Sequence, residues 1–322
     1  MEQIPIKETI LQKYLKIKKR YFPVQNPIKL VVESYEGEIQ LHTVEYPNEG
    51  TMRGVVFIFL GQGSYMDFYG AIFEQFAKQG YRLFGMDRQG FGKSEGKRGD
   101  IGPDPVNDQL IFVDKIIEAK KLQDAKKYIL GMSLGSLLAA RMIQMRPDFF
   151  DGVIFTIPWF ANHDLWHINP IKRWYIDFIS CCSRDSVFTR MKRSEEYEEY
   201  FTYIKEHDPL YVGVFRHNTL SKCLMMQDKL KQEWSKIKIP VFMALAGNDV
   251  VVSNKLNEEL YQQIYHKMNK CTTYEGKPHM LFHQEGDYNQ LIVDSIEWLK
   301  SLDNQDKVAD GDAFDIHYKL NL

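Results

Sequence analysis

The sequence predicts an α/β fold with a mostly parallel central sheet, helices on both faces and an inserted helical cap. Three short runs are apolar at every position, as in strands that are covered on both faces. These runs are 55–60, 128–130 and 153–155. Segments with apolar residues at helical spacing lie around them, at 69–80, 107–121 and 133–146. Such alternation of strands and helices is typical of a doubly wound sheet.

The rest of the chain divides by composition. The expected segments are 1–27, a basic helical extension; 28–160 and 237–302, the α/β core; 161–236, the cap; and 303–322, an acidic tail. The cap stretch is rich in aromatic and charged residues and shows no strong strand run, so it is predicted to be helical. A tight turn at Glu36-Gly37 predicts an antiparallel hairpin at the sheet edge. The acidic tail is expected to be flexible.

Composition excludes several classes of protein. The 322 residues contain 41 Lys plus Arg against 43 Asp plus Glu, so the charge gives no reason to expect nucleic-acid binding. The longest apolar runs fall far short of the roughly 20 residues that span a bilayer, and the start lacks the pattern of a secretory signal. Four cysteines without a C-x-x-C pair indicate neither a disulfide scaffold nor a zinc site. A reducing, cytoplasmic compartment is expected.

Gly131-Met-Ser133-Leu-Gly135 fits the pattern G-x-S-x-G. In this pattern a serine occupies a sharp turn between a strand and a helix. A strand is expected over 127–132 and a helix over 136–146, so the context fits. The N-terminus of that helix would favour negative charge developing near the serine. Ser133 is therefore the predicted nucleophile, and an ordinary strand end punctuated by glycines is the alternative.

A serine nucleophile needs a base, and the base needs an orienting acid. In a fold of this kind the chain order is serine, acid, histidine. Asp249 follows the predicted strand 239–246 and His279 follows the strand 270–274, so these two complete the predicted triad. Two alternatives stay open. Asp249 could cap the next helix, and His283 could replace His279, although His283 is expected on the surface.

The oxyanion formed during acyl transfer requires two backbone N–H donors. One is predicted at Leu134, directly after the nucleophile. The other is predicted at Gln62, in the glycine-rich loop 60–63.

Several other residues can be interpreted either as functional or as structural. Trp159 and Phe160, at the entry to the cap, are predicted to line an acyl pocket; packing of the cap is the alternative, and the two roles do not exclude each other. His163 and His167 are four residues apart, but no Glu follows the first, so no metal site is expected. The adjacent Cys181 and Cys182 are expected to be buried as small hydrophobic residues.

Residues 8–20 place apolar side chains roughly on one face and lysines mostly elsewhere. A basic amphipathic helix can lie on an anionic membrane. The alternative is a terminal helix that packs on its own domain. Peripheral membrane contact through this helix and the cap is therefore one expectation.

Taken together, these motifs resemble the α/β-hydrolases of the monoacylglycerol lipase and lysophospholipase group. The matching segments are Gly131–Gly135, Asp87–Ser94, Asp208–Leu210, Ala246–Asp249 and Tyr274–His279. The resemblance runs from about residue 28 to 301. It implies a serine hydrolase that cleaves carboxylic esters of single-chain lipids, monoacylglycerol or lysophospholipid, through an acyl-enzyme. It also implies an apolar entrance formed by the cap, and no metal or organic cofactor.

One departure from the family pattern concerns the oxyanion loop. The family usually has His-Gly where this chain has Leu60-Gly61, so the loop geometry is expected to differ. The same triad also serves other acyl hydrolases and acyltransferases, such as thioesterases and peptidases. A catalytically weak subunit of a larger assembly is a third hypothesis, motivated by the departure and by the two tails.

Overall fold

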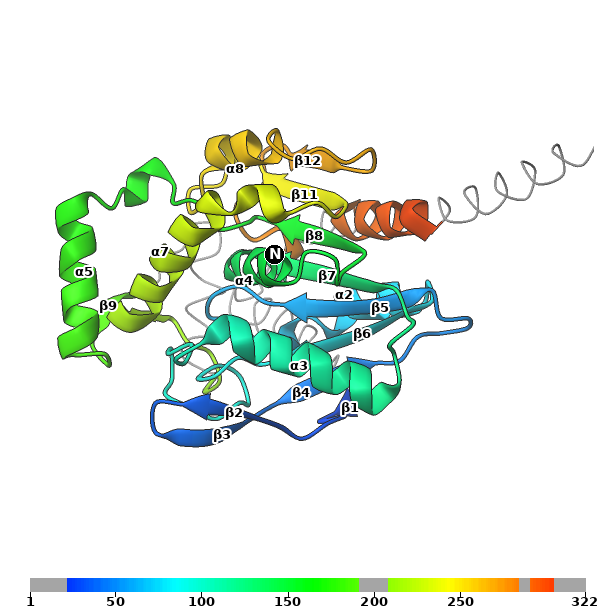
Figure 1. The fold of residues 1–322 in the computed structure, drawn as a ribbon, viewed down its shortest axis with the longest axis horizontal. Coiled ribbons are helices and arrows are strands. Elements are labelled where there is room, and N and C mark those ends of the chain that lie inside the picture. Colours follow the sequence, from blue (N-terminus) through cyan, green and yellow to red (C-terminus); the bar gives the residue numbers. More distant parts are fainter. Residues whose placement is uncertain (1–21, 191–207, 284–289, 304–322) are drawn as a thin grey trace, which may run out of the picture.

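The computed structural model describes residues 22–190, 208–283 and 290–303. Its centre is an eight-stranded sheet (Figure 1). In spatial order the strands are β1 (Val24–Gln25), β4 (Thr43–Tyr46), β6 (Tyr81–Met86), β5 (Gly54–Phe59), β7 (Lys127–Met132), β8 (Gly152–Thr156), β11 (Val241–Ala246) and β12 (Lys270–Tyr274). From β6 to β12 all neighbours are parallel, whereas β4 runs antiparallel to β1 and β6. The predicted mostly parallel sheet is confirmed.

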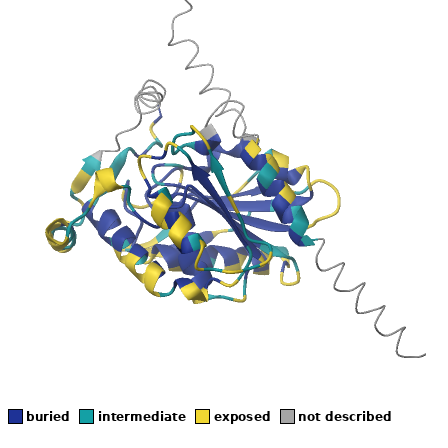
Figure 2. Cartoon of the chain, turned by 90° about the horizontal axis from the view of Figure 1, so that it is seen from above, coloured by how far each residue is buried: buried dark blue, intermediate teal, exposed yellow. Residues whose placement is uncertain are grey.

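Helices cover both faces of this sheet because its strands are apolar on both sides. Along β5 and just past its end, positions 55, 57 and 59 join one hydrophobic core, and positions 56, 58 and 60 join the other. The first core also contains residues of α3 (Pro105–Lys120), α4 (Leu134–Met145) and α8 (Asn254–Tyr261), together with residues of helices between β8 and β11. The second contains residues of α2 (Gly70–Ala77) and of a helix over 290–303. Figure 2 shows the buried strands between these layers.

Helix α3 illustrates how local sequence sets the ends of an element. The Asp104 side chain accepts a hydrogen bond from the Asn107 amide at 3.1 Å, and Pro105 occupies the first turn. Both features favour a helix start. The helix ends at Lys121, whose φ of 53° is left-handed, a common conformation at helix ends.

The described residues between β8 and β11, which we call the cap, form a further layer that packs on the first hydrophobic core. Its described elements are η2 (Asp164–Trp166), α5 (Pro170–Cys182), β9 (Val187–Arg190), β10 (Val214–Arg216), α7 (His217–Gln232) and η3 (Trp234–Lys236). Helix α7 contacts both α4 of the core and α5, which stands at the left of Figure 1. The prediction of an entirely helical cap was wrong, because β9 and β10 pair antiparallel. Their β-branched and aromatic residues favour strands. The boundaries 161 and 236 stay a prediction.

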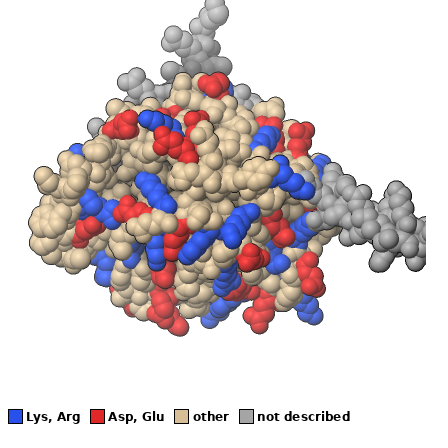
Figure 3. All heavy atoms as spheres, turned by 45° about the horizontal axis from the view of Figure 1, so that its top comes forward, with Lys and Arg blue, Asp and Glu red and all other residues tan. Residues whose placement is uncertain are grey.

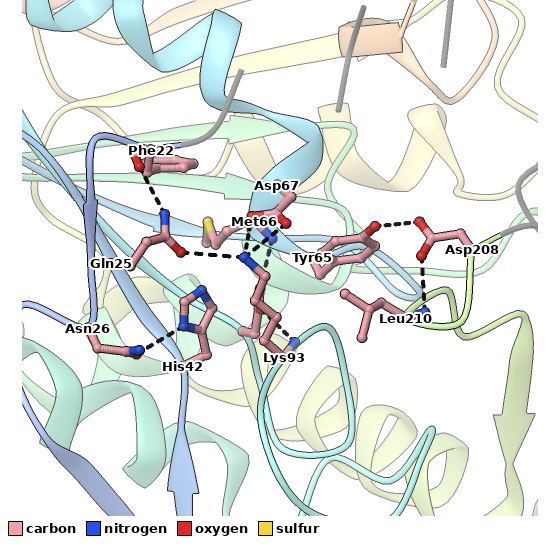
Figure 4. A network of polar contacts seen from close by, with 11 residues as sticks. Phe22, Gln25, Asn26, His42, Tyr65, Met66, Asp67, Lys93, Asp208 and Leu210 are labelled. Carbon is pink, nitrogen blue, oxygen red and sulfur yellow. Dashed lines mark hydrogen bonds and ion pairs between the residues drawn. The ribbon is translucent and has the colours of Figure 1, made fainter. Parts of the chain in front are cut away.

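Polar contacts join the cap to the loop that follows β6. Arg216 Nε donates to the Arg98 carbonyl at 2.7 Å, and the Thr219 hydroxyl donates to the Gly99 carbonyl at 2.8 Å. The Tyr65 hydroxyl also donates to the buried Asp208 carboxylate (Figure 4). Because these groups are buried or half-buried, their hydrogen bonds hold the cap in one position.

A buried polar network fixes the turn after β6. Asp87 accepts hydrogen bonds from the amides of Met66 at 2.7 Å and Lys93 at 2.9 Å. Burial raises the pKa of Asp87 to about 6, although these two amides oppose the shift. The Lys93 ammonium lies 3.0 Å from Asp67 (Figure 4). These contacts attach the turn after β6 to η1 (Met66–Phe68). The short helix η1 itself follows the loop at the end of β5.

The first and last described residues differ from expectation. Strand β1 belongs to the sheet, although a helical extension was expected as far as residue 27. Asp303, predicted to start a flexible tail, accepts hydrogen bonds from the hydroxyls of Tyr81 at 3.2 Å and Tyr128 at 3.0 Å. Two fully buried tyrosines thus fix it in place. The helix predicted at 8–20 and the tail after residue 303 lie outside the described residues.

The predicted hairpin is present, but in a different place. It consists of β2 (Leu30–Ser34) and β3 (Gly37–Leu41), which pair antiparallel around Glu36-Gly37. The two strands form a sheet of their own, rather than an edge of the main sheet. The chain leaves β3 at His42, whose imidazole is hydrogen-bonded to Asn26 at 2.9 Å. Only β4, after this break, continues into the main sheet.

The surface carries mixed charge. Figure 3 shows basic and acidic side chains interspersed over the visible face, while the left edge, where α5 lies, is mostly uncharged. None of the helices in the described ranges is both long enough and apolar enough to cross a membrane.

Replacement of Asp87 by alanine tests the network that fixes this turn. Asp87→Ala leaves two buried amides without an acceptor, so the free energy of unfolding should fall by about 2–5 kcal/mol. Urea unfolding at neutral pH measures it. The control is Asp114→Ala, which removes a surface ion pair with Arg146 and should cost less than about 1 kcal/mol. Equal, small losses in both variants would contradict the assigned role.

Candidate active site

Three predicted residues meet at the carboxyl ends of the parallel strands. Ser133 follows β7, Asp249 follows β11 and His279 follows β12. Parallel strands end at the same edge of a sheet, so residues far apart in the chain come together there. His279 Nε2 lies 3.1 Å from Ser133 Oγ, and His279 Nδ1 lies 2.7 Å from Asp249 Oδ2. Hydrogen bonds therefore link the three side chains in series, from Asp249 through His279 to Ser133.

The backbone of Ser133 is strained. Its φ of 51° and ψ of −113° are rare for a residue with a side chain. Surrounding hydrogen bonds hold this conformation: the Ser133 amide donates to the Thr156 carbonyl at 3.0 Å, and the Ser133 carbonyl accepts from the Trp159 amide at 3.2 Å. A Cβ at Gly135 would lie 1.9 Å from the Phe59 carbonyl oxygen. The glycine therefore lets α4 start directly against the end of β5.

Asp249 orients the imidazole. Its Oδ1 accepts hydrogen bonds from the amides of Val251 at 2.8 Å and Val252 at 3.0 Å, which leaves Oδ2 for His279. The Asp249 side chain has no exposed surface. A carboxylate opposite Nδ1 favours the tautomer in which Nδ1 carries the proton and Nε2 can accept one from serine. The alternative role as a helix cap is wrong, because the Ser253 side chain caps α8.

His279, rather than His283, occupies this position. His279 lies in the loop after β12, within reach of both the serine and the acid. His283 ends the short helix η4 (Leu281–His283), one turn further on. Of the two candidate histidines, His279 is the one within hydrogen-bond distance of Ser133.

Two predicted oxyanion donors lie beside the serine. Leu134 is the first residue of α4, and Gln62 lies in the loop after β5. Among the described residues, neither amide has a recorded hydrogen-bond acceptor. A Cβ placed on Gly61 would lie 3.3 Å from Ser133 Cβ, so this loop runs against the nucleophile. Free N–H groups here and a helix N-terminus suit a developing negative charge.

Two side chains around this loop have contacts that the sequence did not predict. The Gln62 side chain donates to the Val214 carbonyl of β10 at 3.3 Å, so it bridges to the cap. The Arg88 guanidinium donates to the Leu60 carbonyl and, at 2.8 Å, to the Gly61 carbonyl. Strand order provides a signal for Arg88: it comes just after β6, the neighbour of β5, so it must lie beside the loop that follows β5.

The two candidate wall residues differ. The Trp159 ring packs against Phe215 of β10 with centroids 5.6 Å apart, and its backbone contacts Ser133. Its role as a pocket wall stays a prediction. Phe160 is fully buried, with Phe155 at 5.1 Å and Trp234 at 5.3 Å. The structure therefore favours the packing alternative for Phe160, because protein atoms surround its ring completely.

The other singled-out residues lie elsewhere. His163 and His167 line a small cavity. Ser133, His279 and Asp249 are not among the residues that line it. No group of three His, Cys, Asp or Glu in the described ranges could hold a metal ion. Cys181 and Cys182 are exposed and free. Their predicted burial was wrong, because α5 buries only Ile176.

Comparison with known proteins adds independent findings. The profile of the family described as "Serine aminopeptidase, S33" matches residues 50–286. Caffeoylshikimate esterase of Arabidopsis thaliana is 25% identical over 309 residues, covering 92% of this chain and 89% of that protein.

Solved structures share the fold. Paleococcus ferrophilus monoacylglycerol lipase has a TM-score of 0.71 at 22% identity, with coverage of 81% of this chain and 99% of that one. A soluble variant of monoglyceride lipase from Saccharomyces cerevisiae, in complex with a substrate analog, has a TM-score of 0.72 at 18% identity, with coverage of 88% and 99%. These structures support the α/β-hydrolase fold.

The contact of Gly135 with β5 can be tested by substitution. Gly135→Ala places a methyl group against backbone that cannot move aside, so the free energy of unfolding should fall by about 3 kcal/mol or more. Gly50→Ala is the control: its φ is 66°, but nothing lies within 4 Å of the added Cβ. It should cost only about 1–2 kcal/mol. Chemical unfolding of both variants decides, and a larger loss at Gly50 would refute the packing argument.

Proposed function

Because the chain belongs to the serine aminopeptidase S33 family and has the α/β-hydrolase fold, we propose that it hydrolyses carboxylic esters of single-chain lipids. The observation that carries the proposal is the chain Ser133–His279–Asp249 beside two free amides. The names of its relatives, a caffeoylshikimate esterase and two monoacylglycerol lipases, support ester chemistry. Monoacylglycerol and lysophospholipid are the proposed substrates.

In the first half-reaction Ser133 Oγ attacks the ester carbonyl while His279 Nε2 takes the hydroxyl proton. The carbonyl oxygen becomes an oxyanion and accepts hydrogen bonds from the amides of Leu134 and Gln62. When the tetrahedral intermediate collapses, the ester C–O bond breaks and His279 returns the proton to the leaving alcohol. The acyl group remains on Ser133 as an ester.

In the second half-reaction water takes the place of the alcohol. His279 removes a proton from water, the hydroxyl attacks the acyl-enzyme, and the same two amides stabilise the second oxyanion. Collapse releases the fatty acid and returns the proton to Ser133. Asp249 stabilises the imidazolium in both halves without itself being protonated. One oxyanion donor contributes about 2.7–4 kcal/mol to the barrier in comparable sites.

The cap suits a lipid substrate arriving from a membrane surface. Helix α5 exposes 78% of Ile171, 66% of Trp174 and 50% of Phe178. The rings of Trp174 and Phe178 stack at 5.4 Å. A helix with an exposed apolar and aromatic face is typical of proteins that lie in the interface of a bilayer. We propose that α5 rests on the membrane; the helix predicted at 8–20 would add a second contact.

The setting that we infer is cytoplasmic. All four cysteines are free, and Cys181 and Cys182 are exposed on α5. Exposed thiols persist in a reducing compartment. The membrane contact would then be on the cytoplasmic leaflet.

A fluorophosphonate probe tests the nucleophile. The wild type should be labelled, and Ser133→Ala should abolish labelling and lower ester hydrolysis by several orders of magnitude, because the three residues act as a unit. His279→Ala should behave in the same way, whereas the matched control His283→Ala should retain both activities. Labelling that survives in Ser133→Ala would refute the assignment.

The same purified protein can be offered 2-monoacylglycerol, lysophosphatidylcholine, an acyl-CoA and a peptide amide. The proposal requires the two lipid esters to be turned over fastest. Preference for the thioester or the amide would replace it with a thioesterase or a peptidase. A folded wild type that neither reacts with the probe nor turns over any of these would point to a catalytically weak subunit.

A charged substitution on the apolar face of α5 tests whether this helix gives the enzyme access to lipid substrate in a membrane. Trp174→Asp should reduce sedimentation with anionic phospholipid vesicles and slow hydrolysis of monoacylglycerol presented in them. Hydrolysis of a short, water-soluble ester should not change, because the residue is remote from the triad in the fold. The control Met145→Asp makes the same kind of change at a side chain of α4 that is 54% exposed. If both variants sediment like the wild type, α5 does not bind the membrane.

A further inference from the structure

Arg88 is an unusual buried cation. It is only 5% exposed, and its guanidinium lies over the Phe91 ring at 4.9 Å. Among the described residues it forms no ion pair with a carboxylate, and its Nε has no hydrogen-bond partner. Burying a cation without a counter-ion is costly. A residue that merely filled this space could be apolar, so the charge requires another explanation.

The two partners of Arg88 are the carbonyls that precede the predicted oxyanion donor. Nη1 donates to the Leu60 carbonyl and Nη2 to the Gly61 carbonyl at 2.8 Å. The Gly61 carbonyl and the Gln62 N–H belong to one planar peptide unit, in which they point in opposite directions. When the guanidinium holds the carbonyl on one side, the N–H is turned to the other side. Arg88 thus sets the direction of this donor.

The same contact affects the strength of the donor. A hydrogen bond from a cation to a carbonyl is stronger than one between neutral groups. It also polarises the peptide, which makes the N–H at its other end a better donor. Burial lowers the pKa of Arg88 to about 10, so the group is charged at neutral pH. Because the side chain is buried, bulk solvent screens its charge only weakly.

We infer that Arg88 is a positioning residue that aligns and polarises the Gln62 N–H in the oxyanion hole. This inference rests on the proposed function. A guanidinium from the end of the neighbouring strand holds the loop at Leu60 and Gly61. Arg88 never touches the substrate; it acts through the peptide between Gly61 and Gln62.

The test separates transition-state stabilisation from folding. Arg88→Met should lower kcat for ester hydrolysis about 10- to 100-fold and leave KM within about twofold, because the donor acts mainly on the oxyanion. The affinity for a trifluoromethyl ketone, which forms a tetrahedral adduct with the serine, should fall by a similar factor. Arg88→Lys should be intermediate, since one ammonium cannot hold both carbonyls in the same fork.

The matched control is Arg98→Met. Arg98 also donates to two backbone carbonyls, those of Gly92 and Leu210, but not to the oxyanion loop. Its loss should leave kcat and ketone affinity within about twofold. Thermal unfolding of each variant is measured alongside. If Arg88→Met does not fold, the folded Arg88→Lys variant is compared with the wild type instead. A parallel loss of kcat and ketone affinity supports the inference, and wild-type values of both overturn it.

The outcomes are distinguishable. An Arg88 variant that keeps the wild-type kcat and ketone affinity overturns the inference, while the wild type remains an ester hydrolase. A change in KM and thermal stability without loss of ketone affinity also overturns it, because that is the signature of a structural role. If the folded wild type neither reacts with a fluorophosphonate nor hydrolyses esters, the proposed function itself fails.

Discussion

The left-handed backbone at Ser133 is the constraint on which the rest of the site depends. A φ of 51° turns the chain from β7 into α4 within one residue. That turn places the serine at the start of a helix and above the end of the sheet. It is possible only because Gly135 lets α4 approach the Phe59 carbonyl. Close packing of α4 on β5 then brings the loop 60–63 against the nucleophile. The approach of α4 at Gly135 therefore explains both the strained backbone of Ser133 and the position of the predicted oxyanion loop.

The sheet order determines which distant segments can cooperate. Parallel strands β5, β6, β7, β11 and β12 all end at the same edge, and each contributes one loop to the site or its support. The loops after β7, β11 and β12 carry the three hydrogen-bonded residues. The loops after β5 and β6 carry the predicted donor and the arginine behind it. No two of these side chains need to be near one another in the sequence.

Local pattern was enough to predict the parts of the fold that depend on local chemistry. Apolar runs indicated the buried strands, and the glycine spacing around Ser133 indicated the turn. Features that depend on distant partners were missed. The pairing of β9 with β10 joins residues on either side of a long segment, and Asp303 is fixed by two tyrosines from other strands. Cys181 and Cys182 looked suited to burial, but both are exposed on α5.

The bridge from Gln62 to Val214 has a mechanical consequence. Gln62 is joined to the core through its peptide with Gly61 and to the cap through its side chain. This is the residue whose N–H is predicted to be the second oxyanion donor. The position of Gln62 therefore depends on the core and on the cap together. The seating of β10 and the placement of the predicted second oxyanion donor are thereby coupled through a single residue.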